Sequence, residues 1–413
     1  MSALDALVDA RFDDSVSFLR EIVRLPSDTP PGDNAPHARA AAEALESLGF
    51  TVERHPVPAD VVAAHGLVSV TNLIVRHRFG DGPVIALNAH GDVVPPGDGW
   101  TRPPYEGRIE QGRMYGRGVA VSKSDFATFA FALDALKRAA AAGERLRGAV
   151  ELHLTYDEEM GGECGPAWLL EKGLTRPDYA IGAGFSYAVT TAHNGALHLE
   201  VTVRGEAAHA ALPETGVDAL AAAVELMAAL YALRDGYSKL RSSVPGIASP
   251  TINIGLIEGG INTNVVPDRV RFTLDRRIIP EEDPAAVELE IREAIARAKL
   301  RHPRTRVEIR RLLLARALTP LPGQEKLVTA IQHETVRVFG SAAPAMGVPL
   351  YTDARHYAQA GVPVVLYGAG PRSIVEANAK RADENLVLED LRRATKVVAG
   401  ALATLLGPDS AAA

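Results

Sequence analysis

Four short apolar runs, each about as long as a strand and separated by helical stretches, constrain the fold of this chain most. They cover residues 83–87, 149–155, 179–182 and 362–366. Continuous apolar runs that alternate with amphipathic helices are typical of a mostly parallel sheet covered by helices on both faces. We therefore predict an α/β domain in which functional residues gather at the carboxyl ends of the strands.

Residues 195–312 show a different order of elements. The pattern there predicts a strand, a helix, two strands, a helix and a strand, over 197–203, 217–233, 251–257, 270–275, 285–298 and 306–310. This βαββαβ order is the ferredoxin-like, split-βαβ plan of a small α+β domain. We therefore expect residues 195–312 to form a domain inserted into a catalytic α/β domain of residues 1–194 and 313–413.

Composition excludes several classes of function. The chain has 413 residues and a net charge of -7, so it has no basic surplus for nucleic acid. No apolar stretch approaches the roughly 18 residues of a membrane span, and Met1–Leu25 lacks the pattern of a signal peptide. Cys164 is the single cysteine, which rules out an internal disulfide and a thiolate zinc cluster. We expect a cytoplasmic protein with no membrane partner.

Two groups of polar residues follow the predicted strands. His90 and Asp92 come after the first apolar run, and Glu158 and Glu159 come after the second. An imidazole can bind a metal while a nearby carboxylate holds its other ring nitrogen, and one glutamate can act as general base. The alternatives are a histidine that only caps the sheet and a solvated acidic loop. From these residues alone, both interpretations stay open.

Three further residues are weaker candidates. His193 and His356 have ligand chemistry, but we interpret both as ordinary buried or surface histidines. Cys164 follows a glycine turn at a helix start, and we do not expect it to be a nucleophile.

Six motifs occur together in a fixed order along nearly the whole chain. The sequence resembles the M20 family of metallopeptidases and acylases, which includes acetylornithine deacetylases, succinyl-diaminopimelate desuccinylases and carboxypeptidase G-like enzymes. The motifs that carry the resemblance are Asn88–Pro95, Gly116–Gly118 with Lys123, Asp157–Gly162, Gly205–His209, Asn264–Asp268 and Thr352–Arg355.

The resemblance implies a two-metal amidase with five protein ligand positions. His90 and Glu159 match two of the metal ligands, Glu158 matches the general base, and Asp92 matches the carboxylate that holds the histidine. The inserted domain is then a lid and dimerisation domain, so the resemblance also implies a homodimer.

The lid residues of the family have matches as well. His209 matches a histidine that steadies the oxyanion and, in relatives, reaches the site of the partner subunit. Asn264 and Arg277 match residues that hold the carboxylate of a small-molecule substrate.

Three ligand positions of the family are occupied by residues that cannot bind a metal. The bridging aspartate aligns with Val121, the carboxylate of the second metal with Gly184, and the last histidine with Lys380. Asp125 is no substitute, because its spacing from Ser122 indicates a capping box that opens a helix at Asp125. We therefore expect at most one divalent ion, such as zinc, and not a full two-metal site.

The sequence predicts a hydrolase of an amide bond in a small carboxylate-bearing substrate, such as an N-acyl amino acid or dipeptide. Glu158, Asp92, His209 and Lys380 are the expected catalytic residues. We expect the ammonium of Lys380 to stand where the second metal stood and to pair with Glu159 or Glu158. The alternatives are a metal-independent enzyme for proton transfer or decarboxylation of an amino-acid derivative, and a non-catalytic binding protein.

Overall fold

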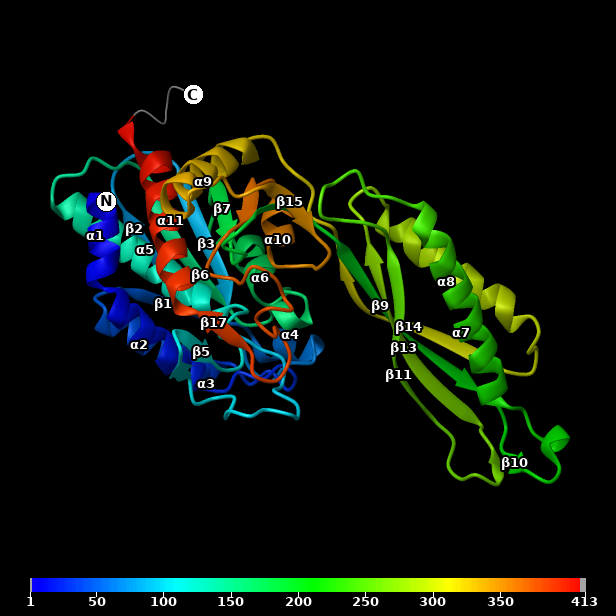
Figure 1. Ribbon diagram of the computed structural model, residues 1–413. Helices are drawn as coiled ribbons and strands as arrows, with labels where there is room; N and C mark the ends of the chain where they lie inside the picture. Colours follow the sequence, from blue (N-terminus) through cyan, green and yellow to red (C-terminus); the bar gives the residue numbers. More distant parts are fainter. Residues whose placement is uncertain (1, 409–413) are drawn as a thin grey trace. The chain divides into compact units, whose positions relative to one another are not determined.

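The computed structural model describes residues 2–408, and these form two compact units (Figure 1). The first unit runs to Thr191 and continues over Pro320–Met346 and from Thr352 onward. The second unit comprises Ala192–Thr319 and Gly347–Tyr351.

An eight-stranded sheet organises the first part of the fold. Its strand order is β1-β2-β6-β3-β7-β16-β8-β15. The strands are β1 (Val52–Pro56), β2 (Thr71–Arg78), β3 (Val84–His90), β6 (Ala149–Thr155), β7 (Tyr179–Gly182), β8 (Val189–His193), β15 (Ala345–Val348) and β16 (Val364–Leu366). β3 is parallel to both β6 and β7, and β16 is parallel to β7. The predicted apolar runs therefore form the parallel centre of the sheet.

Helices cover both faces of this sheet because successive side chains of a buried strand point to opposite sides. Leu152 and Leu154 of β6 belong to the core that also contains α5, whereas the ring of His153 bonds to the hydroxyl of Tyr357 in α10 at 2.7 Å. The helices of this unit are α1 (Ala3–Ala10), α2 (Phe12–Val23), α3 (Ala35–Ser47), α4 (Ala59–Ala64), α5 (Lys123–Ala141), α6 (Pro166–Glu171), α9 (Gln324–Phe339), α10 (Ala354–Gln359) and α11 (Leu388–Leu406).

The second unit has the predicted βαββαβ order. β9 (Gly195–Arg204), β11 (Thr251–Gly259), β13 (Arg269–Ile278) and β14 (Arg306–Ala315) form an antiparallel sheet of order β11-β13-β9-β14. Helices α7 (Ala219–Gly236) and α8 (Pro284–Lys299) bury their apolar side chains against that sheet. The result is a ferredoxin-like α+β unit with its own core.

The second unit is wider than the expected residues 195–312. It begins at Ala192, ends at Thr319 and also includes a separate segment that the sequence did not indicate. Residues 347–351, expected in the α/β domain, belong to the second unit. The reason is contact with the loop after α7: the amide of Gly347 donates to the carbonyl of Pro245 at 2.7 Å, and Gly347 lies against Ile247.

Two small sheets complete the described fold. β10 (Ala208–His209) pairs with β12 (Val265–Val266) in the second unit. β4 (Arg108–Glu110), β5 (Arg113–Tyr115) and β17 (Asn385–Val387) form a three-stranded sheet in the first unit. Over residues 2–408, none of the helices combines the length and the apolar character that crossing a membrane requires.

Candidate active site

The candidate site lies where two parallel neighbours, β3 and β6, end side by side. His90 is paired in register with Thr155, so the residues that follow each strand emerge at the same edge of the sheet. The fully buried carboxylate of Asp92 accepts hydrogen bonds from the backbone amides of Glu158 at 3.3 Å and Glu159 at 3.0 Å. Asp92 thus ties the two strand ends together.

The ring of His90 lies between Asp92 and Glu158. Its Nδ1 donates to the carbonyl of Asp92 at 3.0 Å and is 3.4 Å from Oδ1 of that residue, and its Nε2 is 3.8 Å from Oε2 of Glu158. Burial opposes a charge on the ring, but the surrounding carboxylates, Glu158 foremost, raise the pKa of His90 to about 10. The ring of His90 is therefore held between two carboxylates.

Glu158 has the environment of a proton-transfer group. Burial raises the pKa of Glu158, with a further rise from Glu159 and an opposing effect from His90. A carboxyl whose pKa is raised toward neutrality is better matched to general acid–base work than an exposed one.

The ammonium of Lys380 lies directly against Glu159. Nζ of Lys380 is 2.5 Å from Oε2 of Glu159, whose side chain is only 6% exposed, while 49% of the lysine side chain remains exposed. Desolvation opposes the lysine charge, but attraction to Glu159 and Glu158 raises the pKa of Lys380. The predicted contact between Lys380 and a glutamate is present, and the partner is Glu159.

The donor set does not fit a two-metal centre. Val121 offers no donor atom, and a Cβ added at Gly184 would lie 2.7 Å from backbone atoms of Leu366 and Tyr367, which leaves no room for a carboxylate. Lys380 carries a charged ammonium. Within residues 2–408, no group of three or more His, Cys, Asp or Glu side chains is arranged to hold a metal ion.

The capping-box interpretation of Ser122 and Asp125 is wrong. Helix α5 begins at Lys123, and the side chain of Ser122 makes no cap. Instead Oγ of Ser122 accepts from the amide of His90 and lies 3.0 Å from its carbonyl, whereas Asp125 accepts from the amide of Ala369 at 2.6 Å. Long-range partners have displaced the local bond that the spacing predicts.

Sequence reasoning missed Asp353 as part of this site. Its buried carboxyl accepts a hydrogen bond from Thr155, the last residue of β6, at 3.3 Å. Burial, together with repulsion from Glu158, raises the pKa of Asp353 to about 8. The only signal was its place in the Thr352–Arg355 motif, which carried no role in the sequence argument.

Sequence reasoning also missed a buried ion pair next to the site. Oε2 of Glu384 is 2.6 Å from NH1 of Arg117, and both side chains are almost fully buried. The other oxygen, Oε1, accepts from the amides of Ala120 at 3.1 Å and Val121 at 3.3 Å. Glu384 lies four residues after Lys380, so this carboxylate links the loop of Val121 to the loop of Lys380.

The weaker candidates do not supply replacement chemistry. His356 is buried and bonds through Nε2 to the carbonyl of Gly161 at 2.9 Å. His193 is buried in the second unit, where Nδ1 bonds to the carbonyl of Asn194 at 2.8 Å. Burial raises the pKa of the Cys164 thiol to about 12, which makes it a poor nucleophile.

The remaining predicted residues lie in the second unit. His209, in β10, and Asn264, just before β12, are exposed neighbours, because the amide of Ala210 donates to the carbonyl of Asn264 at 3.0 Å. Arg277 is paired with Asp275 at 2.8 Å and is partly exposed, whereas Arg276 is buried and bound to Glu282. Arg277 is thus the more accessible of the two arginines.

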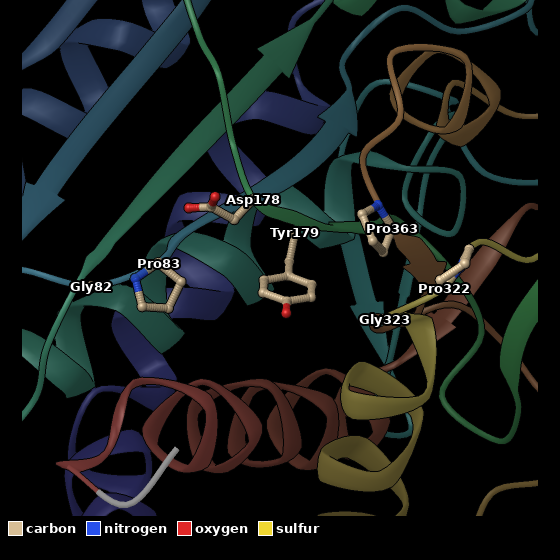
Figure 2. Close-up of a pocket in the computed structure, with 7 residues that line it drawn as sticks. All are labelled: Gly82, Pro83, Asp178, Tyr179, Pro322, Gly323 and Pro363. Atoms are coloured by element: carbon tan, nitrogen blue, oxygen red, sulfur yellow. The ribbon is translucent and has the colours of Figure 1, made fainter. Parts of the chain in front are cut away.

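A surface hollow of about 450 Å³ lies at the other end of the sheet (Figure 2). It is lined by residues at the amino ends of β3, β7 and β16 and at the start of α9, namely Gly82, Pro83, Asp178, Tyr179, Pro322, Gly323 and Pro363. Asp178 is the one acidic residue in this lining, and its carboxylate accepts a hydrogen bond from the amide of Val84 at 2.8 Å. The hollow therefore adds nothing to the candidate site at the carboxyl ends.

Comparisons with known proteins agree in family and fold. The chain is 31% identical over 383 residues to the acetylornithine deacetylase of Myxococcus xanthus, with 91% of this chain and 93% of that protein covered. It is 29% identical to the succinyl-diaminopimelate desuccinylase of Methylobacterium sp. (strain 4-46), with 92% of each chain covered.

Solved structures share the fold at low sequence identity. Human carnosine dipeptidase 1 matches with a TM-score of 0.78 at 18% identity over 98% of this chain and 99% of that one. The M20 family metallo-carboxypeptidase Sso-CP2 from Sulfolobus solfataricus matches with a TM-score of 0.76 at 18% identity, over 94% and 98%. The profile described as peptidase family M20/M25/M40 matches residues 86–404, and the chain therefore belongs to this family.

Proposed function

We propose that this protein hydrolyses an amide bond in a small carboxylate-bearing substrate of the N-acyl amino acid or dipeptide type. Family membership supports the reaction class, and the names of the relatives support the substrate class. The observation that carries the proposal is that Lys380 pairs with Glu159 and not with Glu158. Glu158 therefore stays available as the base, beside the ring of His90.

The residues of the first unit then have distinct roles. Glu158 takes a proton from the attacking water and passes it to the leaving nitrogen. Asp92 fixes the orientation of His90 and, through the two backbone amides, the turn that carries Glu158. The positive charges of His90 and Lys380 stabilise the negative charge that develops on the carbonyl oxygen.

We assign substrate binding to residues of the second unit by family resemblance. His209 donates a hydrogen bond to the oxyanion, and Asn264 with Arg277 binds the substrate carboxylate, for which an arginine fork is well suited. The exposure of His209 and Asn264 supports this assignment.

We also propose a homodimer formed through the second unit. β11 is an edge strand, and it exposes Leu256 and Ile257, while α7 exposes Leu220 and Val224. An uncovered strand edge beside apolar side chains favours pairing with a second copy. Sedimentation should show a dimer that Leu256→Arg dissociates, and a monomeric wild type would contradict the proposal.

The cytoplasm is the proposed location, in line with a single cysteine.

Turnover of a panel of N-acetyl and N-succinyl amino acids and dipeptides tests the proposed reaction. Glu158→Gln keeps the shape but cannot accept the proton, so kcat should fall about 10²- to 10⁴-fold. Glu171→Gln is the matched control, because that side chain is 76% exposed on a surface helix. Hydrolysis that survives in Glu158→Gln, or a wild type that turns over no member of the panel, would refute the assignment.

A further inference from the structure

The family relation implies divalent metals, and the structure replaces their ligands with a fixed ammonium. We propose that Lys380 is the permanent cation of this site, standing where relatives hold the second metal ion, and that the protein needs no divalent metal. The inference concerns the charge of the site and is tested independently of which substrate the protein hydrolyses.

The ligand count argues against a catalytic zinc. Such sites use three protein ligands, and here only His90 and Glu159 remain from the family set. Glu159 is already bound by Lys380 at 2.5 Å, so a cation at this carboxylate would have to displace the ammonium or lie beside it. A new carboxylate cannot be supplied at Gly184, where backbone atoms of Leu366 and Tyr367 fill the space.

The conformation of Lys380 indicates that its position is imposed by the surrounding structure. Its φ is +60°, in the left-handed region that non-glycine residues rarely adopt, and Asn378 and Asp383 in the same loop also have positive φ. Such backbone persists only where its surroundings hold it. Here the amide of Lys380 donates to Oε2 of Glu384 at 3.4 Å, and Arg117 clamps the same oxygen.

The same buried carboxylate holds both replaced loops. Oε1 of Glu384 accepts from the amides of Ala120 and Val121, while Oε2 accepts from the amide of Lys380 and from Arg117. The site therefore retains the scaffold for two ligand-bearing loops, but one loop now presents a valine and the other an ammonium. The side chain of Lys380 stays half exposed.

The acidic residues of the site need a cation in any case. Asp92 accepts hydrogen bonds from the backbone amides of Glu158 and Glu159, and the side chains of all three residues are largely buried. Buried carboxylates are unfavourable unless they are paired or hydrogen-bonded. The ring of His90 lies 3.4 Å from Asp92 and 3.8 Å from Glu158, and the ammonium of Lys380 pairs with Glu159. The charge that metal ions supply in relatives is thus provided by side chains of this chain.

Zinc stoichiometry measured by mass spectrometry tests the proposal without an activity assay. Wild-type protein is stripped with a chelator, equilibrated with a small excess of zinc and freed of loose metal. We expect a zinc-to-chain ratio near zero after this treatment. Retention of about one zinc or more per chain would overturn the proposal.

Two substitutions at one position locate the cation. Lys380→His removes the ammonium, frees Glu159 and adds a third donor to His90 and Glu159, so the ratio should rise to about one ion per chain. Lys380→Met frees Glu159 without adding a donor, and its ratio should stay near zero. Lys396→His is the control, because Lys396 pairs with Asp9 on distant helices. A Lys380→His ratio equal to that of the control would show that Lys380 does not occupy a metal position.

Discussion

Two regions of the same site differ in what they keep from the family. The strand ends of β3 and β6 carry His90, Asp92 and the two glutamates, whereas the residues that we align with the other ligand positions, Val121, Gly184 and Lys380, offer no metal donor. The strand-end region is fixed by sheet register and by Asp92. The loop region is fixed by Glu384, which binds backbone amides and an arginine.

The difference shows that the scaffold of the loops is independent of their donor atoms. Glu384 accepts hydrogen bonds from the backbone amides of Val121 and Lys380. Side chains at these positions can therefore change without loss of the loop conformation. At the strand ends, by contrast, the side chains of Asp92 and His90 themselves form the links between the elements.

The largest expected effect comes from breaking the support of the loop region. Arg117→Met leaves the buried carboxylate of Glu384 without its charged partner, so we expect a loss of about 3–5 kcal/mol in the free energy of unfolding. Chemical denaturation measures it. Arg393→Met is the control, since Arg393 forms an exposed pair with Glu389 that contributes about 0.5 kcal/mol. Equal losses in the free energy of unfolding of the two variants would contradict the role of Glu384 in holding the two loops.

A smaller effect is expected at the strand ends. Asp92→Asn keeps one acceptor but weakens the bonds to the amides of Glu158 and Glu159, so kcat should fall about 10- to 100-fold. A reduced kcat in steady-state kinetics, together with a near-wild-type melting temperature, would identify a positioning role for Asp92. Asp178→Asn is the matched control, because Asp178 also accepts from a backbone amide, but at the opposite end of the sheet. If both variants kept wild-type kcat, the strand-end region would not be catalytic.

The smallest effect concerns Gly184, which we align with a ligand position of the family. Gly184→Ala places a methyl group 2.7 Å from backbone atoms of β16 and the following residue, and we expect a destabilisation of about 1–3 kcal/mol. Thermal unfolding measures it. Gly236→Ala, at the end of α7 with open space around it, should instead stabilise by about 0.5–1 kcal/mol. A Gly184→Ala variant with wild-type thermal stability would show that this position can accept a side chain.

Much of the fold followed from local patterns. The apolar runs predicted β3, β6, β7 and β16 because a buried parallel strand needs apolar side chains on both faces. The order of elements after residue 195 predicted the ferredoxin-like sheet in the same way. A contact of Lys380 with Glu159 or Glu158 also followed from sequence, because a lysine at a ligand position supplies positive charge; the structure shows that the partner is Glu159.

What could not be predicted depends on partners that are distant in the chain. Arg117 and Glu384 are 267 residues apart, and nothing in either segment indicates that they meet. Asp353 joins Thr155 across 198 residues. Ser122 and Asp125 have the spacing of a helix cap, but His90 and Ala369 offer competing partners that only the tertiary structure brings near. Residues 347–351 lie in the second unit and not in the expected one for the same reason, because their partner, the loop after α7, is distant in the chain.

The close packing at Gly184 bears on the history of the site. A lineage that exchanged metal donors for a lysine could reverse the changes at residues 121 and 380 by single substitutions, since neither side chain supports the loop backbone. The glycine is different, because backbone atoms of Leu366 and Tyr367 occupy the space where a side chain would begin. A carboxylate at residue 184 would therefore require these backbone atoms to shift first. This close packing makes the loss of the second ion hard to reverse.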